Sequence, residues 1–144
     1  MNIAWGVVVI VLSVVCWGGQ VVSWCWPRRA VEWGLAEAES EVERVFWLDG
    51  RGEALWDLAI LWTMPVAGVM LVADHDWWPY FGLVGGGSYL YFAGRGIVVR
   101  LLMRRQRVRI GSPSSVAVGL TALAAWGAMA VITVVAAIVA LEGV

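Results

Sequence analysis

The sequence predicts an all-α integral membrane protein with four transmembrane helices and one cytoplasmic amphipathic helix between the first and second of them. Three observations predict this class. Hydrophobic residues make up 61% of the 144 residues, whereas soluble domains contain about 45–50% apolar residues. Several apolar segments are long enough to cross a hydrocarbon core of about 30 Å. Arginine supplies all ten basic charges, and most of them lie in two connections between these segments, which is typical of cytoplasmic loops.

The first predicted span covers residues 3–22, which carry no charge. Arg28 and Arg29 follow it and predict that this end is cytoplasmic and that the N-terminus is outside. Over residues 28–48, apolar side chains recur at intervals of four and three, which predicts the amphipathic helix; they are Val31, Leu35, Ala38, Val42 and Val45. Its flanks are acidic, whereas helices that lie on lipid carry basic flanks. We therefore expect it to pack on protein, near the basic loop.

The second and third predicted spans form a tight antiparallel hairpin. Residues 49–52, Asp-Gly-Arg-Gly, predict a turn before the second span, residues 54–73. Pro65 lies inside this span and lacks a backbone donor, so it predicts a kink. Residues 74–76, Asp-His-Asp, leave room only for a short turn before the third span, residues 77–99.

The densest positive charge follows the third span. It consists of Arg100, Arg104, Arg105, Arg107 and Arg109 and predicts that the loop of residues 100–113 is cytoplasmic. Ser112 and Pro113 then predict an N-cap and a first helical residue. The fourth span, residues 115–141, is uncharged. Together the spans predict one transmembrane domain over residues 1–144 in a cell inner membrane, with both termini outside.

Small residues mark the surfaces through which these helices are expected to pack, since lipid gives apolar helices no hydrophobic reason to associate. One predicted contact face lies on the third span and contains Gly82, Gly85, Gly86, Gly87 and Gly94. The other lies on the fourth span and contains Ala117, Thr121, Ala124, Ala125 and Ala128. Contact within one bundle and contact between subunits are both open for these faces.

Arg95 is a charge inside the third predicted span, where it needs a partner or a route to water. Asp57 lies at a comparable depth in the neighbouring second span. We therefore predict an ion pair between Asp57 and Arg95, which would fix the helix register or, in a functional role, bind an anion or gate a path. Five aromatic residues lie deep in the predicted spans and are candidates either for core packing or for an apolar pocket: Trp17, Trp62, Tyr89, Tyr91 and Trp126.

The sequence contains no residue pattern for catalysis, a cofactor or a metal ion, so we expect none of these. It has one histidine, and Cys16 and Cys25 would lie about 13 Å apart along a helix, which is too far for a disulfide. We also expect no nucleic-acid partner, because membrane topology already explains the arginines. The expected partners are the lipid bilayer and other membrane subunits.

The predicted function is therefore helix–helix assembly, either as a homo-oligomer or as an accessory subunit of a larger membrane complex. The alternative is a small oligomeric channel or transporter for ions or small solutes. In that alternative, the glycine face of the third span would line the path, and Arg95 would set a preference for anions.

Overall fold

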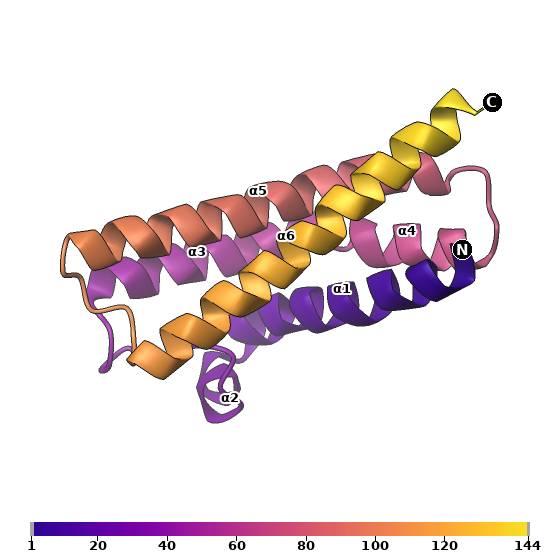
Figure 1. Cartoon of the computed structure of the whole chain (residues 1–144). Helices are drawn as coiled ribbons and strands as arrows, with labels where there is room; N and C mark the ends of the chain where they lie inside the picture. Colours follow the sequence, from indigo (N-terminus) through magenta and orange to yellow (C-terminus); the bar gives the residue numbers. More distant parts are fainter. Residues whose placement is uncertain (1, 144) are drawn as a thin grey trace.

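The computed structural model describes residues 2–143, and within that range the chain forms six helices and no strand (Figure 1). Helices α1, α3, α4 and α5 run alongside one another, and α6 crosses them obliquely. The all-helical class is confirmed. In chain order the helices are α1 (Asn2–Cys25), α2 (Pro27–Glu32), α3 (Arg44–Ile60), α4 (Thr63–Val72), α5 (Trp78–Arg105) and α6 (Pro113–Glu142).

Three segments of the described chain are long and apolar enough to cross a membrane: Ile3–Cys25, Arg44–Val72 and Pro113–Glu142. They agree with three of the four predicted spans. Helix α5 is 28 residues long, but its glycines, its tyrosines and Arg95 lower its hydropathy, and it is not among the three. A span at residues 77–99 therefore stays a prediction.

The prediction of one amphipathic helix over residues 28–48 is wrong. Helix α2 ends at Glu32, Gly34 adopts a φ of 70°, and residues 33–43 form turns and bends. A glycine in the left-handed region commonly ends a helix. Glutamates 37 and 41, and likewise 39 and 43, would also be like-charge pairs four residues apart, which destabilise a helix.

The segment of residues 37–43 nevertheless lies against the basic loop, as predicted. The amide of Glu43 donates a hydrogen bond to the carbonyl of Arg109 (2.9 Å). The amide of Arg109 donates in return to the Glu43 carboxylate (3.0 Å). The two connections are thus joined by hydrogen bonds to the backbone of Arg109, and not by an ion pair between the Glu43 and Arg109 side chains.

The predicted turn at residues 49–52 is also wrong, because these residues are helical in α3. Among the described atoms, none lies within 4 Å of a Cβ added at Gly50 or Gly52. The two glycines therefore weaken the helix only through backbone entropy, at about 0.5–1 kcal/mol each. Helix α3 consequently begins ten residues before the predicted second span.

The kink predicted from Pro65 is present as a break between α3 and α4. The proline ring has no N–H and displaces the carbonyl four residues earlier, that of Leu61. This carbonyl instead accepts a hydrogen bond from the Met64 amide (3.3 Å). Just before the break, the carbonyl of Leu58 accepts a hydrogen bond from the indole N–H of Trp17 on α1 (3.0 Å). A neighbouring helix thus satisfies a backbone group at the break, as the membrane requires.

Glycine lets the helices approach at three places. On α1 and α4, a Cβ at Gly6 would lie 3.1 Å from the carbonyl of Gly68, and the reverse distance is the same. On α5, a Cβ at Gly85 would lie 2.8 Å from Met64 Cα of α4. One residue later, a Cβ at Gly86 would clash with Val134 of α6. Helix α5 therefore contacts α4 and α6 through adjacent glycines.

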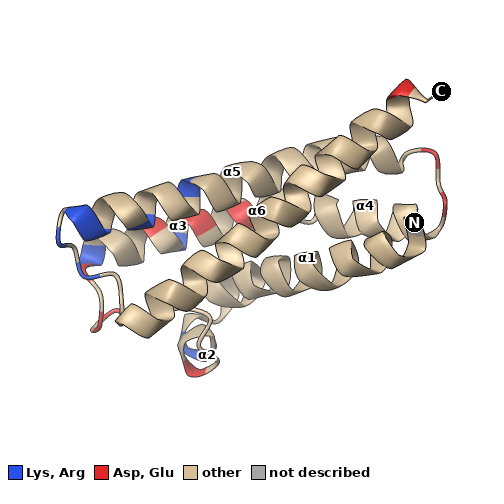
Figure 2. Ribbon diagram, in the orientation of Figure 1, with Lys and Arg blue, Asp and Glu red and all other residues tan. Residues whose placement is uncertain are grey.

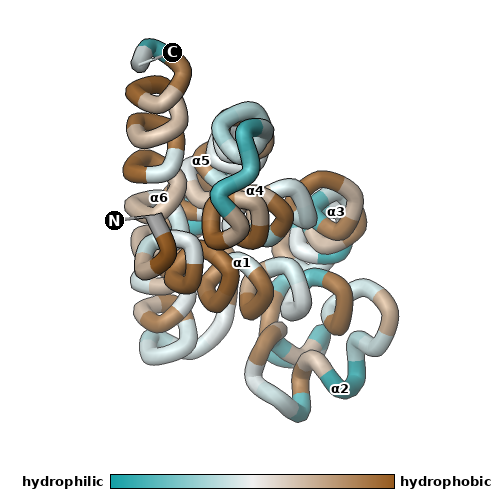
Figure 3. The backbone as a smooth tube through the Cα atoms, turned by 90° about the vertical axis from the view of Figure 1, so that its right-hand side faces the viewer, coloured by the Kyte–Doolittle hydropathy of each residue, from teal (hydrophilic) through white to brown (hydrophobic). Residues whose placement is uncertain are grey.

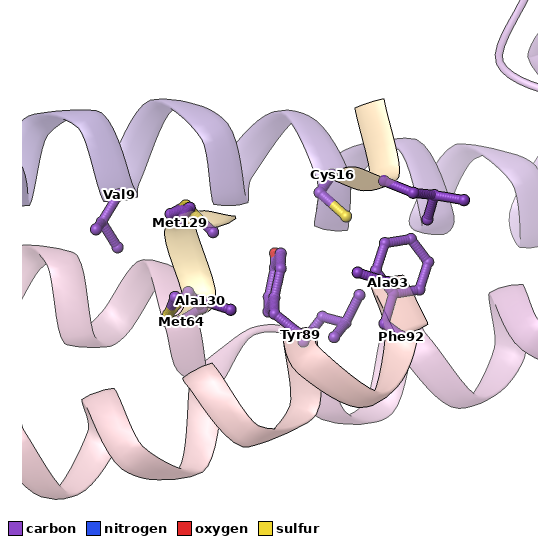
Figure 4. Close-up of a cluster of buried hydrophobic side chains, with 10 residues drawn as sticks. Val9, Cys16, Met64, Tyr89, Phe92, Ala93, Met129 and Ala130 are labelled. Atoms are coloured by element: carbon purple, nitrogen blue, oxygen red, sulfur yellow. The ribbon is translucent and has the colours of Figure 1, made fainter. Parts of the chain in front are cut away.

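Buried aromatic side chains complete the core (Figure 4). The Tyr89 hydroxyl donates a hydrogen bond to the backbone carbonyl of Ser13 (3.0 Å), and the Trp126 indole donates one to the carbonyl of Leu12 (3.0 Å). Both acceptors lie on α1, so α5 and α6 are each tied to it by a polar contact. Because these donors are satisfied, the bulky rings can be buried between the helices.

The basic residues are gathered toward one end of the bundle, whereas acidic residues lie at both ends (Figure 2). The arginines lie toward the end where α1 and α5 finish, whereas the other end holds the chain termini and the acidic turn between α4 and α5. At the arginine-rich end, Ser112 caps α6 as predicted, because its hydroxyl accepts a hydrogen bond from the Ser115 amide (3.2 Å).

Candidate binding site between α3 and α5

Arg95 is paired with α3, but not through the predicted residue. Its guanidinium donates one hydrogen bond to the Glu53 carboxylate (3.0 Å) and another to the Asp49 carboxylate. These are the two ion pairs found among the described residues. The predicted ion pair with Asp57 is therefore wrong. The predicted turn had removed Asp49 from the helix and left Glu53 before the second span, whereas the structure places both on α3.

Asp49, Glu53 and Asp57 follow one another at intervals of four and so share one face of α3. At about 1.5 Å per residue, Asp57 lies roughly 22 Å from the end of α4 at Val72. A hydrocarbon core about 30 Å thick would therefore enclose Asp57 and leave Asp49 near its boundary. The carboxylates form a row that leads from the arginine-rich end into the span.

Asp57 is the innermost and most buried carboxylate of this row. The residue is 2% exposed, and its Oδ2 atom has no hydrogen-bond partner among the described residues. A buried carboxylate without a partner is expensive, and buried charges are normally paired. Arg95 acts on Asp57 only through space, because its hydrogen bonds go to Glu53 and Asp49, one and two turns away on α3.

A half-open hollow of about 170 Å³ lies beside this carboxylate. Trp56 and Tyr91 form its exposed rim, each 59% exposed, whereas Phe92 is 4% exposed and forms part of its floor. Gly52, Glu53, Asp57 and Arg95 supply the remaining lining. Aromatic and acidic groups from α3 and α5 thus meet at one place.

The glycine face of α5 divides into two groups. Gly82, Gly85 and Gly86 are buried against α4 and α6, and they account for the close helix contacts. Gly87 and Gly94 are exposed, and no described atom lies within 4 Å of a Cβ added at either position. Three of the five predicted contact residues therefore pack within the bundle.

The small-residue face of α6 points the other way. All five of its members are exposed: Ala117, Thr121, Ala124, Ala125 and Ala128. The opposite face of α6 packs on the bundle through residues that include Leu123, Ala130 and Thr133. The predicted α6 face is therefore free in the single chain.

The five aromatic residues predicted for the core or a pocket lie in three different environments. Trp17, Tyr89 and Trp126 belong to the core, where each donates a hydrogen bond to another helix. Trp62 is exposed, and Tyr91 lines the hollow. The sequence did not single out Trp56 and Phe92, which also line the hollow. The interval of four residues between Asp49, Glu53 and Asp57 was a signal for this face of α3.

No known protein family, curated protein or solved structure matches this chain. Its function must therefore be inferred from its own geometry. Within residues 2–143, no three His, Cys, Asp or Glu side chains are grouped so that they could hold a metal ion. The α3 carboxylates are spread over about 12 Å of helix and do not converge on one point. Three carboxylates against the guanidiniums of Arg95 and Arg100, which both act on Glu53, leave this region with one net negative charge, and this disfavours an anion.

Proposed function

We propose that the chain is a four-span inner-membrane protein that acts through helix–helix assembly, and that α6 pairs with α6 of a second copy. The observation that carries this proposal is the exposed small-residue face of α6, from Ala117 to Ala128. Small residues let helix backbones approach closely, and this is a main source of helix association in lipid. An accessory role beside a different membrane subunit is the competing outcome.

The position of the small residues along α6 favours one region of contact. The same exposed face continues beyond Ala128, but with branched side chains that include Val131 and Val135, which are 49% and 55% exposed. Close approach is therefore possible over the first half of α6 and is blocked over the second. Figure 3 shows α6 along one side of the bundle, where a second chain can reach it.

Identical α6 helices suit each other because this part of the chain has no charge between Pro113 and Leu141. A self-complementary patch is the requirement for a two-fold symmetric dimer. Two such faces bring no unpaired charge into lipid, and the Thr121 hydroxyl is already satisfied by the Ala117 carbonyl (2.9 Å).

Replacing Ala125 with Ile tests the α6 contact. The larger branched side chain would separate two apposed α6 backbones, so we expect the dimer dissociation constant in lipid nanodiscs or mild detergent to rise at least tenfold. Ala59→Ile makes the same change at an exposed position of α3 and should leave the constant unchanged. A dimer that tolerates Ala125→Ile, or a monomer that copurifies with a different subunit, would overturn pairing between copies.

The proposed topology places the arginine-rich end in the cytoplasm, since short loops rich in arginine are retained there. Cys25 is exposed and unpaired near this end. A membrane-impermeant maleimide should therefore fail to label Cys25 in intact cells and should label it in inverted vesicles. Asp76→Cys in a Cys25→Ser background should show the reverse, and labelling of Cys25 in intact cells would refute this orientation.

A small channel or transporter is the second candidate, and the carboxylate row on α3 favours it. A path along α3 and α5 would select cations, because Asp49 and Glu53 hold the Arg95 guanidinium. Liposomes that contain only this chain should then pass a small cation at a rate that Asp57→Asn reduces. Impermeable liposomes would exclude this candidate and leave assembly.

A further inference from the structure

The unpartnered carboxylate of Asp57 points to a missing positive charge. Its Oδ2 atom is buried without a hydrogen-bond partner among the described residues, and the residue lines the hollow between α3 and α5. A carboxylate within a membrane span normally pairs with another group or marks a path or binding site. The hollow borders this residue and is the space from which such a partner would approach it.

The walls of the hollow suit an organic cation better than a bare metal ion. Trp56, Tyr91 and Phe92 supply three aromatic side chains, and aromatic faces attract ammonium and guanidinium groups. Trp56 and Asp57 both line the hollow, so the aromatic rim and the carboxylate border the same space. A metal ion would instead need several converging oxygen ligands.

The volume of the hollow indicates the size of the group that it can hold. Its volume is about 170 Å³, and a cavity of about 150 Å³ holds a benzene-sized molecule. The exposed Trp56 and Tyr91 leave one side open for entry. A ligand with one small ring or a short branched chain, and one charged nitrogen, fits this space.

The ion pairs of Arg95 leave one negative charge for such a ligand. The guanidinium is already bound to Asp49 and Glu53, and it donates no hydrogen bond to Asp57. Arg100 also lies close enough to act on Glu53, so three carboxylates and two guanidiniums leave one net negative charge. An incoming cation gains an ion pair and relieves a buried charge at the same time.

We propose that this hollow is a binding site for a small amine in its ammonium form. The Asp57 carboxylate is the counter-ion, Trp56 and Tyr91 cover the ligand at the open side, and Phe92 contacts its apolar part. Arg95 is a positioning residue that holds the α3 carboxylates on the neighbouring turns. This site is independent of the α6 contact, because it uses α3 and α5 alone.

Binding of benzylammonium to the full chain in nanodiscs tests the proposal. Benzyl alcohol has the same number of heavy atoms without the charge, and benzoate reverses the charge, so the three probes separate charge from size. Binding is measured by equilibrium dialysis, and empty nanodiscs correct for partition into lipid. We expect saturable binding of benzylammonium, at least tenfold tighter than that of benzyl alcohol, and no saturable binding of benzoate.

Two variants, Asp57→Asn and Trp56→Leu, locate the binding, and a third, Asp76→Asn, is a matched control. Asp57→Asn keeps the shape of the side chain and should weaken benzylammonium binding about tenfold to a hundredfold, the range expected when a charged hydrogen bond is lost. Asp76→Asn makes the same chemical change at the far end of the bundle and should bind as the original chain does. Trp56→Leu changes an exposed rim residue and should weaken binding about threefold to tenfold through the lost cation–π contact.

Three outcomes would overturn the site. They are equal affinities for benzylammonium and benzyl alcohol, an unchanged affinity in Asp57→Asn, and an absence of saturable binding in the original chain. The last result would mean that water alone fills the hollow. Because Trp56 is exposed, its variant is expected to fold, and an unchanged affinity in Trp56→Leu would refute the aromatic rim even if Asp57→Asn were unstable.

Discussion

Gly85 and Gly87 lie two residues apart on α5 and provide a stringent test of the packing. A Cβ at Gly85 would lie 2.8 Å from Met64 Cα and 2.9 Å from Met64 N, whereas ordinary contacts begin at 3.4 Å. The obstructing atoms belong to the backbone, so α4 and α5 must move apart by about 0.6 Å to admit the methyl group. No described atom lies within 4 Å of a Cβ at Gly87.

The two Gly→Ala variants should therefore differ in sign. Overpacking costs about 1–3 kcal/mol, and alanine returns about 0.5–1 kcal/mol of helix stability relative to glycine. Gly85→Ala should thus lower the free energy of unfolding by about 1–2 kcal/mol, and Gly87→Ala should leave it unchanged or raise it by up to about 1 kcal/mol.

Unfolding of both variants can be followed by circular dichroism during titration of the nanodisc- or micelle-bound protein with a denaturing detergent. The comparison is matched because helix, residue type and substitution are the same. If Gly85→Ala and Gly87→Ala unfolded at the same detergent fraction, the close contact between α4 and α5 would be refuted.

Two further predictions concern polar contacts between helices. A double-mutant cycle of Arg95→Gln and Glu53→Gln should show a coupling free energy of about 0.5–3 kcal/mol. The cycle of Arg95→Gln and Asp57→Asn should show a smaller coupling free energy. If the second coupling were the larger one, Arg95 would pair with Asp57, as the sequence predicted. Tyr89→Phe should lower the free energy of unfolding by about 1 kcal/mol, since it removes one buried hydrogen bond to α1. An unchanged unfolding midpoint in Tyr89→Phe would show that this hydroxyl bond contributes nothing.

The sequence predicted those features of the fold that depend on local chemistry. Pro65 marks the break between α3 and α4 because a missing donor acts within one helical turn. Ser112 caps α6 for an equally local reason. Gly82, Gly85 and Gly86 were identified as contact residues because a bare backbone on a helix face is visible from spacing alone.

Features that depend on contacts between distant segments were missed. Gly6 and Gly68 are separated by 62 positions in the sequence, and neither belongs to a local pattern, yet they meet where α1 crosses α4. The partner of Arg95 was misassigned because the glycines at positions 50 and 52 suggested a turn. In the folded chain these residues continue α3, and tertiary packing outweighs their low helix propensity.

The candidate site was predictable only in part. Arg95 and Tyr91 were identified as candidates, and Asp57 was given the role of an ion-pair partner. That the Asp57 carboxylate is left unpaired follows from the ion pairs of Arg95 with Asp49 and Glu53, and this needed the correct register of α3 against α5. Trp56 lies directly before Asp57, but only the contact of the two helices turns it into the rim of a hollow.

The cost of keeping Asp57 buried leads to a last prediction, which separates a binding carboxylate from a structural one. If Asp57 stabilised the bundle, Asp57→Asn would lower the free energy of unfolding. The structure predicts the opposite without ligand, because the change removes a buried charge that has no partner among the described residues. The asparagine amide is still a buried polar group, so only the charge is relieved, and we expect a rise of about 1 kcal/mol in the free energy of unfolding.

The effect should reverse when ligand is present. Saturating benzylammonium should stabilise the original chain according to its affinity and should stabilise Asp57→Asn less, because the variant binds more weakly. The difference between the two unfolding midpoints should therefore narrow or change sign. Arg95→Gln should behave differently, since it leaves Asp49 and Glu53 unpaired and lowers stability with or without ligand. Destabilisation by Asp57→Asn in the absence of ligand would show that this carboxylate has a structural partner and would remove the reason for a cation in the hollow.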